Sequence, residues 1–414
     1  MDLIIGAGIS GLSYAYFCGH KEYMIIDRDL SIGGYCKTTK RNGFVWDYSG
    51  HFFHFQNQEL ERLLTSDMSD DDFVEVVKHT FIKYKDGLID YPFQKNIHQL
   101  PKEEFIDCIY DLFNNDNSEY SNFKEMLYAK FGKSIAEKFL IPYNSKLYAC
   151  DLNSLDKEAM GRFFPYAQKE DIIKNFKGCD NSSYNSSFVY PVGGAIEYVN
   201  AIYNKLSKNN VILGNEVVSI NRIDKTLILS NGQTIHYDRL ISTIPFPKLL
   251  ELVSIEYPHH VYSWNQVLVF NLGFNKKGKD TNSHWLYFPE NKYCFYRVGF
   301  YDNILGQDRM SLYVELGFNK NEVLNPNFWL GRVLSDLYKA EIIDETQLLV
   351  DYESVIMNPA YVHINEAVIN DVKEKKDFLR ENGIYSIGRY GSWTYCSIED
   401  NIIEAMNLAK SIGK

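Results

Sequence analysis

The stretch that decides the fold is Asp2–Asp29, DLIIGAGISGLSYAYFCGHKEYMIIDRD. Its apolar run LII predicts a buried parallel strand, and the run YMII predicts a second one. Between these runs, Gly6, Gly8 and Gly11 form the pattern G-x-G-x-x-G where a strand turns into a helix. Gly6 would make the tight turn, Gly8 would let backbone approach a pyrophosphate, and Gly11 would let the helix pack closely on the strand.

The helix start and the acid after the second strand complete the expected dinucleotide site. Free N–H groups and the positive end of the helix dipole attract a pyrophosphate, so we expect Ile9 and Ser10 to contact the cofactor. Asp27 ends the second strand, next to Arg28, and is placed to accept hydrogen bonds from ribose hydroxyls. The stretch therefore predicts an α/β, Rossmann-like domain that binds a dinucleotide.

The residues that follow Asp27 indicate which dinucleotide is bound. SIGGYCKT places Gly33, Gly34 and Tyr35 shortly after the acid, and GFVWDYSGHFFHF comes next. This order resembles the FAD-binding group that includes amine oxidases, protoporphyrinogen oxidase and UDP-galactopyranose mutase. A classical NAD dehydrogenase would continue with another βαβ unit instead. The resemblance implies FAD in a glutathione-reductase-type domain, with Gly34 and Tyr35 beside it.

Two later stretches resemble the same group. Residues 215–245 look like the β-meander in which backbone near Val218 contacts adenine. Residues 385–412 read as a strand, a loop with Arg389, and a helix. In the resembling group Arg389 lies on FAD and the N-terminus of this helix, at Ser397, faces the flavin. Ser397 and Asp400 have the spacing of a capping box.

Four segments sharpen the resemblance to UDP-galactopyranose mutases, especially their eukaryotic branch. They are DYPFQKNIHQLPKEEF (90–105), KFLIPYNSKLYA (138–149), HWLYFPENKYCFYRVGFYDN (284–303) and GRYGSWTY (388–395). The resemblance implies interconversion of the pyranose and furanose forms of a UDP-hexose, through an adduct between flavin N5 and the sugar. It also implies a role in surface polysaccharide synthesis. FAD would act in its reduced form, with NAD(P)H as a candidate reductant.

One arginine stands out in the apolar strand CFYRVGF, residues 294–300. A guanidinium cannot shed its proton, so a buried Arg297 needs an anionic partner. Either an acidic side chain pairs with it or the anion arrives from outside. The resemblance implies that Arg297, together with Arg162 in AMGRFFP, neutralises the substrate diphosphate. The alternatives are an internal ion pair for Arg297 and an ordinary helix-surface position for Arg162.

The remaining site residues are implied by the same resemblance. His51 in SGHFFHF matches the loop beside flavin N5, although Ser49 stands where the family has glycine. Tyr148 stands where the eukaryotic branch has tryptophan, and Ile304 where a tyrosine is expected, so the hexose stays open. The implied substrate-binding residues are Tyr91, Gln94, Asn144, Tyr148, Tyr361 and Tyr395.

A chain of 414 residues is too long for one ordinary core, and we expect three interleaved domains. The FAD-binding domain would collect residues 1–85, 190–245 and 380–414. A helical domain would cover 98–180. An antiparallel β-sheet substrate domain would gather 86–97 and 246–379.

Charge and composition limit the partners. A net charge of −11 argues against nucleic acid as a partner. The seven cysteines show no C-x-x-C pairing, which argues against a metal site or a disulfide framework and favours a cytoplasmic protein. We find no apolar run long enough for a transmembrane segment and no signal peptide in MDLIIGAG. A homodimer is a candidate assembly.

Two other functions compete with the mutase hypothesis. One is an FAD-dependent oxidoreductase of the amine oxidase or protoporphyrinogen oxidase type, which would need an apolar or amine-binding cavity. The other is a flavoprotein that binds without chemistry. Arg162 and Arg297 are hard to justify in the former, and the His51 loop disfavours the latter.

Overall fold

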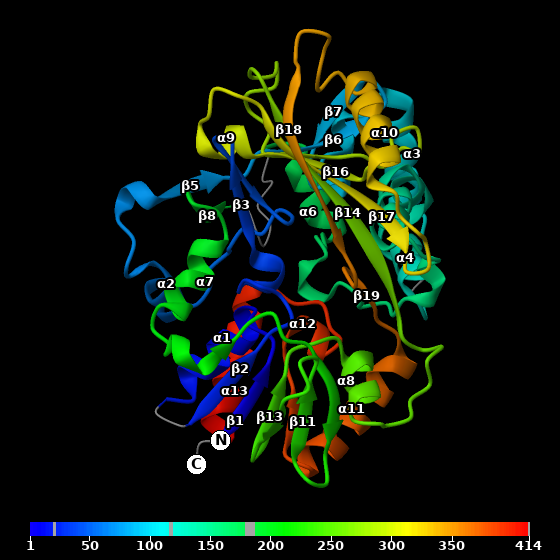
Figure 1. The fold of residues 1–414 in the computed structure, drawn as a ribbon. Coiled ribbons are helices and arrows are strands. Elements are labelled where there is room, and N and C mark those ends of the chain that lie inside the picture. The colour runs from blue at the N-terminus through cyan, green and yellow to red at the C-terminus, as the bar shows by residue number, and fades with distance from the viewer. Residues whose placement is uncertain (20–21, 116–118, 179–186, 413–414) are drawn as a thin grey trace.

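Two sheets organise the chain, and the computed structural model describes them over residues 1–19, 22–115, 119–178 and 187–412. In Figure 1 a parallel sheet lies at the bottom, near both termini, and a larger sheet lies at the top. The chain crosses between these halves several times, so neither half is one continuous segment. Cys179 lies outside the described residues, and the other six cysteines are free. None of the described helices is long and apolar enough to cross a membrane.

The parallel sheet grows from the glycine motif. Its central strand β1 is buried at every residue, because neighbouring strands flank it and other elements cover both faces. The strands lie in the order β20 (Ile384–Ser386), β13 (Arg239–Ser242), β1 (Asp2–Ile5), β2 (Tyr23–Ile26) and β9 (Val211–Ile212). One face packs on α1 (Ile9–Phe17), α7 (Ile196–Tyr203) and α13 (Ile398–Ile412). The predicted Rossmann-like domain is confirmed.

The other face of the parallel sheet is covered by a small antiparallel sheet and two helices. The small sheet is the predicted meander, with β10 (Val217–Asn221), β11 (Thr226–Leu229) and β12 (Thr234–His236). Beside it lie α8 (Phe246–Leu252) and α11 (Glu366–Glu381). These elements share one buried apolar cluster with β1 and β13.

The larger sheet is antiparallel except where β15 pairs with β6 in parallel. Its order is β18 (Leu349–Met357), β14 (Ser263–Phe274), β17 (Ser311–Asn319), β16 (Arg297–Phe300), β15 (Trp285–Tyr287), β6 (Thr80–Tyr84) and β7 (Gly87–Asp90), with β19 (Val362–His363) on β14. Alternate residues of β14 face opposite sides. Val267 and Val269 face the helical region, while Leu268 and Phe270 face α10 (Pro326–Lys339). The sheet is therefore covered on both faces.

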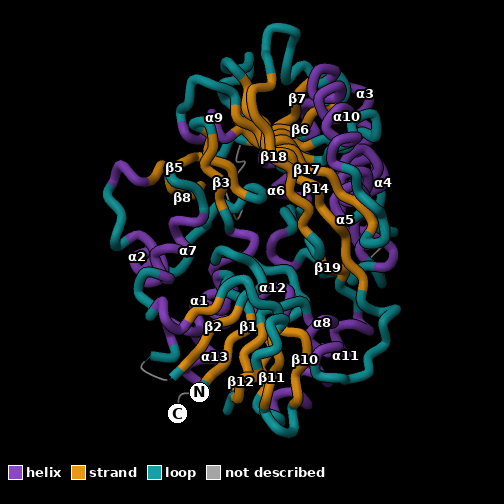
Figure 2. Tube along the Cα trace, in the orientation of Figure 1, coloured by secondary structure: helices purple, strands orange, loops and turns teal. Residues whose placement is uncertain are grey.

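Helices and short hairpins fill the space around the two sheets, as Figure 2 shows. The helical region lies beside the larger sheet and contains α3 (Lys102–Phe113), α4 (Phe123–Ile135), the π-helix η5 (Ala136–Leu140), α5 (Ile141–Tyr148) and α6 (Lys169–Asn175). The remaining elements are β3 (Thr38–Arg41), β4 (Phe44–Asp47), α2 (Gln58–Thr65), β5 (Phe73–Val77), β8 (Ser187–Pro191), α9 (Tyr301–Leu305) and α12 (Gly388–Gly391).

Two predicted domain boundaries need correction. Strand β6 lies within residues 1–85 but pairs with β15 of the larger sheet, so the first FAD-domain segment ends before residue 80. Helices α8 and α11 lie within 246–379 but pack on the parallel sheet. Sequence adjacency misled the prediction because β6 joins strands that come much later in the chain, whereas α8 and α11 return to the sheet that begins with β1. The other boundaries stay predictions.

Helix α1 crosses β1 so closely that Gly11 has no room for a side chain. A Cβ atom at Gly11 would lie 2.0 Å from the carbonyl oxygen of Gly6. Gly331, in α10, is also helical, but a Cβ atom there would meet nothing within 4 Å. We predict that Gly11→Ala lowers the free energy of unfolding by about 1–3 kcal/mol through overpacking. Gly331→Ala should raise it by up to about 1 kcal/mol through helix propensity.

Urea unfolding of the two variants and the unchanged protein measures both effects. The close approach of α1 to β1 would be contradicted if Gly11→Ala were as stable as Gly331→Ala.

Candidate functional site

A cavity of about 980 Å³ lies between the two sheets. On one side it meets the carboxyl ends of the parallel strands, at Ile5 and Ile26. On the other side its wall includes Val267, Tyr287 and Arg297 from three strands of the larger sheet. Ligands of open α/β sheets bind at the carboxyl ends of strands, so this cavity is the candidate site.

The glycine motif forms a cradle at one end of the cavity. Gly6 has φ +107°, and a Cβ there would lie 2.1 Å from Thr243 Oγ1, so the turn requires glycine. The Asp27 carboxylate accepts hydrogen bonds from the backbone N–H of Ala7 at 2.6 Å and of Asp29 at 2.9 Å. The acid therefore fixes the turn and also faces the cavity.

The predicted cofactor residues gather around this cradle with two exceptions. Those that line the cavity are Gly6, Gly8, Ile9, Ser10, Asp27, Arg28, Gly34, Tyr35, Arg389 and Ser397. Gly11 lies behind the cradle, against Gly6, as its predicted packing role requires. Val218 does not line the cavity; its side chain is 50% exposed, while Val217 is buried and faces the cavity. A register shift in β10 between Val217 and Ser219 decides which residue turns inward.

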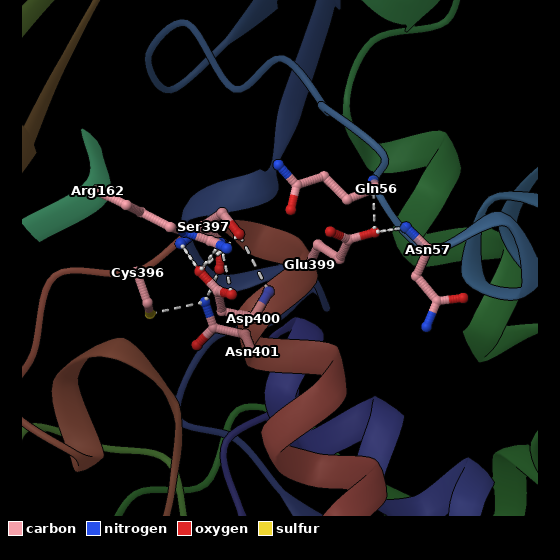
Figure 3. A network of polar contacts seen from close by, with 8 residues as sticks. All are labelled: Gln56, Asn57, Arg162, Cys396, Ser397, Glu399, Asp400 and Asn401. Carbon is pink, nitrogen blue, oxygen red and sulfur yellow. Dashed lines mark hydrogen bonds and ion pairs between the residues drawn. The ribbon is translucent and has the colours of Figure 1, made fainter. Parts of the chain in front are cut away.

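Helix α13 begins at the cavity with the predicted capping box. The backbone N–H of Ser397 donates to Asp400 Oδ2 at 2.8 Å, and the backbone N–H of Asp400 donates to Ser397 Oγ at 3.1 Å. Figure 3 shows that Glu399, in the same turn, accepts from the backbone N–H groups of Gln56 and Asn57. The helix start is thus tied to the segment that follows His51.

The fit of FAD can be judged from polar atoms that the protein itself leaves without a partner. Among the described residues, His51 Nδ1 and Arg389 Nε are buried, have no hydrogen-bond partner, and belong to residues that line the cavity. Such atoms normally bond to a ligand or to water. Burial, helped by the charge of Arg389, lowers the pKa of His51 to about 4, so His51 is neutral near pH 7. The cradle and these atoms fit a dinucleotide that spans the cavity.

Tyrosines form the wall opposite the cradle. The predicted Tyr91, Tyr361 and Tyr395 all line the cavity. Tyr361 and Tyr395 stack with ring centroids 5.8 Å apart. The Arg389 guanidinium lies 4.6 Å from the Tyr395 ring centroid and 5.2 Å from that of Tyr361. This stacking holds a cation at the cavity surface.

Arg297 has a native carboxylate partner. In the register of β16 and β17 it lies opposite Glu315, and its Nε and Nη2 donate to the two carboxylate oxygens at 2.7 and 2.9 Å. Ser49 Oγ also donates to Glu315. Burial alone would raise the pKa of Glu315, but Arg297 and Ser49 more than offset it, so the pKa lies below its usual value. Of the two alternatives for Arg297, the internal ion pair is present, and Arg297 also lines the cavity.

Arg162 also has a carboxylate partner. Its Nη2 donates to Asp400 Oδ1 at 2.7 Å and Oδ2 at 2.8 Å, and its side chain is 46% exposed at the cavity rim. It lies in a single 3₁₀ turn, Gly161–Phe163, rather than on the surface of a regular helix.

Three predicted substrate residues lie outside the cavity. Gln94 is fully buried and donates to the carbonyl oxygen of Pro165. Asn144 donates to the carbonyl oxygen of Leu140 at 2.7 Å within its own helix. Tyr148 is buried behind the wall, with its ring centroid 6.0 Å from that of Tyr361. In the part of the chain that the structure describes, each of the three also has a buried side-chain oxygen without a hydrogen-bond partner, so their role in substrate binding stays a prediction. Ile304 is likewise buried.

Among the described residues, six tyrosines that line the cavity were not predicted from the sequence: Tyr48, Tyr143, Tyr166, Tyr287, Tyr296 and Tyr390. Tyr287 lies between the rings of Tyr91 and Tyr143, with 5.0 Å between centroids in each pair. Tyr143 precedes the predicted Asn144, and Tyr296 precedes Arg297. Tyr143, Tyr287, Tyr296 and Tyr390 lie within the segments that carry the mutase resemblance, so these segments place more side chains at the cavity than were predicted.

Comparison with solved structures identifies the fold. A crystal structure of reduced UDP-galactopyranose mutase superposes with a TM-score of 0.93 at 24% identity, over 99% of this chain and 93% of that one. A candidate protoporphyrinogen oxidase from Exiguobacterium sp. 255-15 superposes with a TM-score of 0.78 at 16% identity, over 100% and 98%. Putrescine oxidase bound to putrescine has a TM-score of 0.63 at 14% identity, over 99% and 98%. The chain has the fold of these flavoproteins.

A family model described as an NAD(P)-binding Rossmann-like domain matches residues 4–66. This match covers the cradle, Asp27 and the Gly33–Gly34 turn. The match supports a Rossmann-like dinucleotide-binding domain at this end of the chain.

The Arg297–Glu315 pair should be essential to stability because both charges lie inside the wall. We predict that Glu315→Gln lowers the free energy of unfolding by about 3–5 kcal/mol, since it leaves a buried guanidinium unpaired. Glu353→Gln is a matched control in the same sheet, because Glu353 accepts from the neutral Thr39 hydroxyl. Glu353→Gln should lower the free energy of unfolding by less than about 1.5 kcal/mol.

Urea unfolding measures the free energy of unfolding of both variants. The double variant Arg297→Met with Glu315→Leu, which replaces both charges with apolar side chains, should recover most of the stability lost in Glu315→Gln. If Glu315→Gln were as stable as Glu353→Gln, the Arg297–Glu315 pair would be accessible to water and not buried in the wall.

Proposed function

We propose that the protein interconverts the pyranose and furanose forms of a UDP-hexose, with FAD as its cofactor. The fold likeness to reduced UDP-galactopyranose mutase suggests the reaction class. The charge of the cavity wall is the observation that supports a nucleotide diphosphate as the substrate.

The cavity is basic in an acidic protein. Six of its lining side chains are basic and four are acidic, whereas the whole chain has a net charge of −11. Neither Arg162 nor Arg297 belongs to the glycine turn Gly6–Gly11, and we assign their charge to a second anion, which would act beside Asp400 and Glu315. Arginine suits this task because its planar fork can bind phosphate oxygens in pairs.

Each part of the wall has a role in this proposal. Arg297 and Arg162 bind the diphosphate and neutralise it while it is detached from the sugar. Tyr91, Tyr361 and Tyr395 orient the substrate, and Arg389 lies toward FAD. When bound, reduced FAD supplies the nucleophilic centre that the sugar exchange needs. His51, neutral at the cavity, presents its loop beside the flavin.

An FAD-dependent oxidoreductase is the second candidate. Two observations favour it: the likeness to a candidate protoporphyrinogen oxidase at a TM-score of 0.78, and the native carboxylates on both arginines, which weaken their pull on an outside anion. An amine or apolar substrate, however, would gain nothing from a wall with an excess of basic side chains. The mutase proposal explains that excess.

The reaction itself can be tested with a panel of UDP-hexoses. We predict that the dithionite-reduced protein converts at least one of them to a furanose isomer, while the oxidised protein does not. Chromatography of the nucleotide sugars measures the product. Equal product from oxidised protein, or oxidation of the substrate with flavin reduction, would contradict the proposal and favour the oxidoreductase.

Binding at Arg297 can be tested without turnover. We predict that Arg297→Lys, which keeps the charge but loses the fork, weakens UDP binding to the reduced protein roughly tenfold. Arg239→Lys is the control, since Arg239 also pairs with a carboxylate, Asp2 at 2.7 Å, but lies outside the cavity. Calorimetric titration with UDP gives both dissociation constants. Equal affinities in the two variants would place the diphosphate away from Arg297.

A further inference from the structure

The start of α13 carries a carboxylate whose charge acts on the cavity rim. Asp400 Oδ2 accepts from both the backbone N–H and the hydroxyl of Ser397, each at 2.8 Å. These two bonds fix the carboxylate in the first helical turn. Asp400 is therefore a rigid anion and not a mobile surface side chain.

Arg162 reaches this anion from a distant part of the chain. Figure 3 shows its side chain extending from its own segment to the first turn of α13, where it meets Asp400. The same nitrogen, Nη2, donates to both carboxylate oxygens, and 238 positions separate the two residues. The ion pair thus connects the helical region to the helix that begins at the cavity.

The neighbouring acid in the same turn behaves differently. Glu399 is 5% exposed and accepts from two neutral backbone N–H groups, those of Gln56 and Asn57, at 3.0 and 2.7 Å. Asp400 is thus the acid of this turn that holds a cavity-lining arginine.

We propose that Asp400 is a positioning residue that competes with the substrate diphosphate for Arg162 and thereby limits how tightly the nucleotide is held. The inference rests on the proposed function, because it takes a diphosphate as the competing anion. An anion that approaches Arg162 meets a carboxylate already within hydrogen-bond distance of the same guanidinium. Either the ion pair opens or the two anions share the cation, and both outcomes weaken binding.

Weaker ground-state binding is useful to an isomerase of this kind. Substrate and product carry the same UDP group, so tight binding of that group would hold the product without lowering the barrier. A fixed counter-ion at Arg162 keeps the arginine in place when the cavity is empty and favours release when the reaction is complete.

The test is UDP binding to the flavin-loaded, reduced protein with Asp400→Asn. Asparagine keeps an oxygen that can accept from Ser397 but loses the charge. We expect UDP to bind roughly three- to tenfold more tightly, with the gain shrinking at high salt. In an Arg162→Gln background the same substitution should change the dissociation constant by less than about twofold. A purely structural role in capping would weaken binding and would not depend on Arg162.

Glu399→Gln is the matched control. It removes the same charge from the same helical turn without changing the partner of Arg162, and Glu399 itself lines the cavity. A general loss of negative charge would therefore raise UDP affinity in Glu399→Gln at least as much as in Asp400→Asn, whereas competition for Arg162 predicts a clearly smaller gain in Glu399→Gln. Unchanged or weaker UDP binding in Asp400→Asn, or a gain that persists without Arg162, would overturn the inference while the proposed function stands. If neither the unchanged protein nor Asp400→Asn binds UDP, the proposed function falls and the inference falls with it.

Discussion

The cavity wall depends on one buried ion pair, Arg297 with Glu315. The two residues lie opposite each other in β16 and β17, so the antiparallel register itself brings the charges together. Ser49 adds a third group, because its hydroxyl donates to the same carboxylate. Ser49 belongs to the segment that leads from β4 to His51 in the cavity. The pair therefore fixes the face of the larger sheet and the loop beside the cradle at once. If the larger sheet or the loop shifted, a charged side chain would be buried without its partner.

The parts of the site that the sequence predicted correctly are local in the chain. Gly6, Gly8 and Asp27 belong to one strand–turn–helix–strand unit, whose geometry follows from neighbouring residues alone. The Ser397–Asp400 cap is local in the same sense, since its bonds span one helical turn. A pattern within about thirty residues carries enough steric information to fix both structures.

The sequence alone does not display a small irregularity or a distant partner that decides which side chain faces the cavity. In β10 a register shift turns Val217 inward instead of Val218. Before α5, the π-helix Ala136–Leu140 changes the angular phase of the helix, so Tyr143 faces the cavity and Asn144 bonds within the helix. Glu315 could not be assigned to Arg297 without the strand register. These features follow from tertiary packing, which a single sequence does not display.

The two paired arginines explain how a cationic wall can exist in the ligand-free molecule. A guanidinium buried without an anion costs several kcal/mol, so a site that relied on substrate alone would be unstable whenever it was empty. Glu315 removes that cost for Arg297 deep in the wall, whereas Arg162 at the rim is 46% exposed and pairs with Asp400 in contact with water. The two pairs differ in exposure: the Glu315 side chain is 1% exposed and that of Asp400 is 32% exposed. Water can screen and replace the rim pair far more easily than the buried one. An anionic ligand would therefore bind near Arg297 while the Arg297–Glu315 pair stays intact. At Arg162, however, the ligand can displace Asp400.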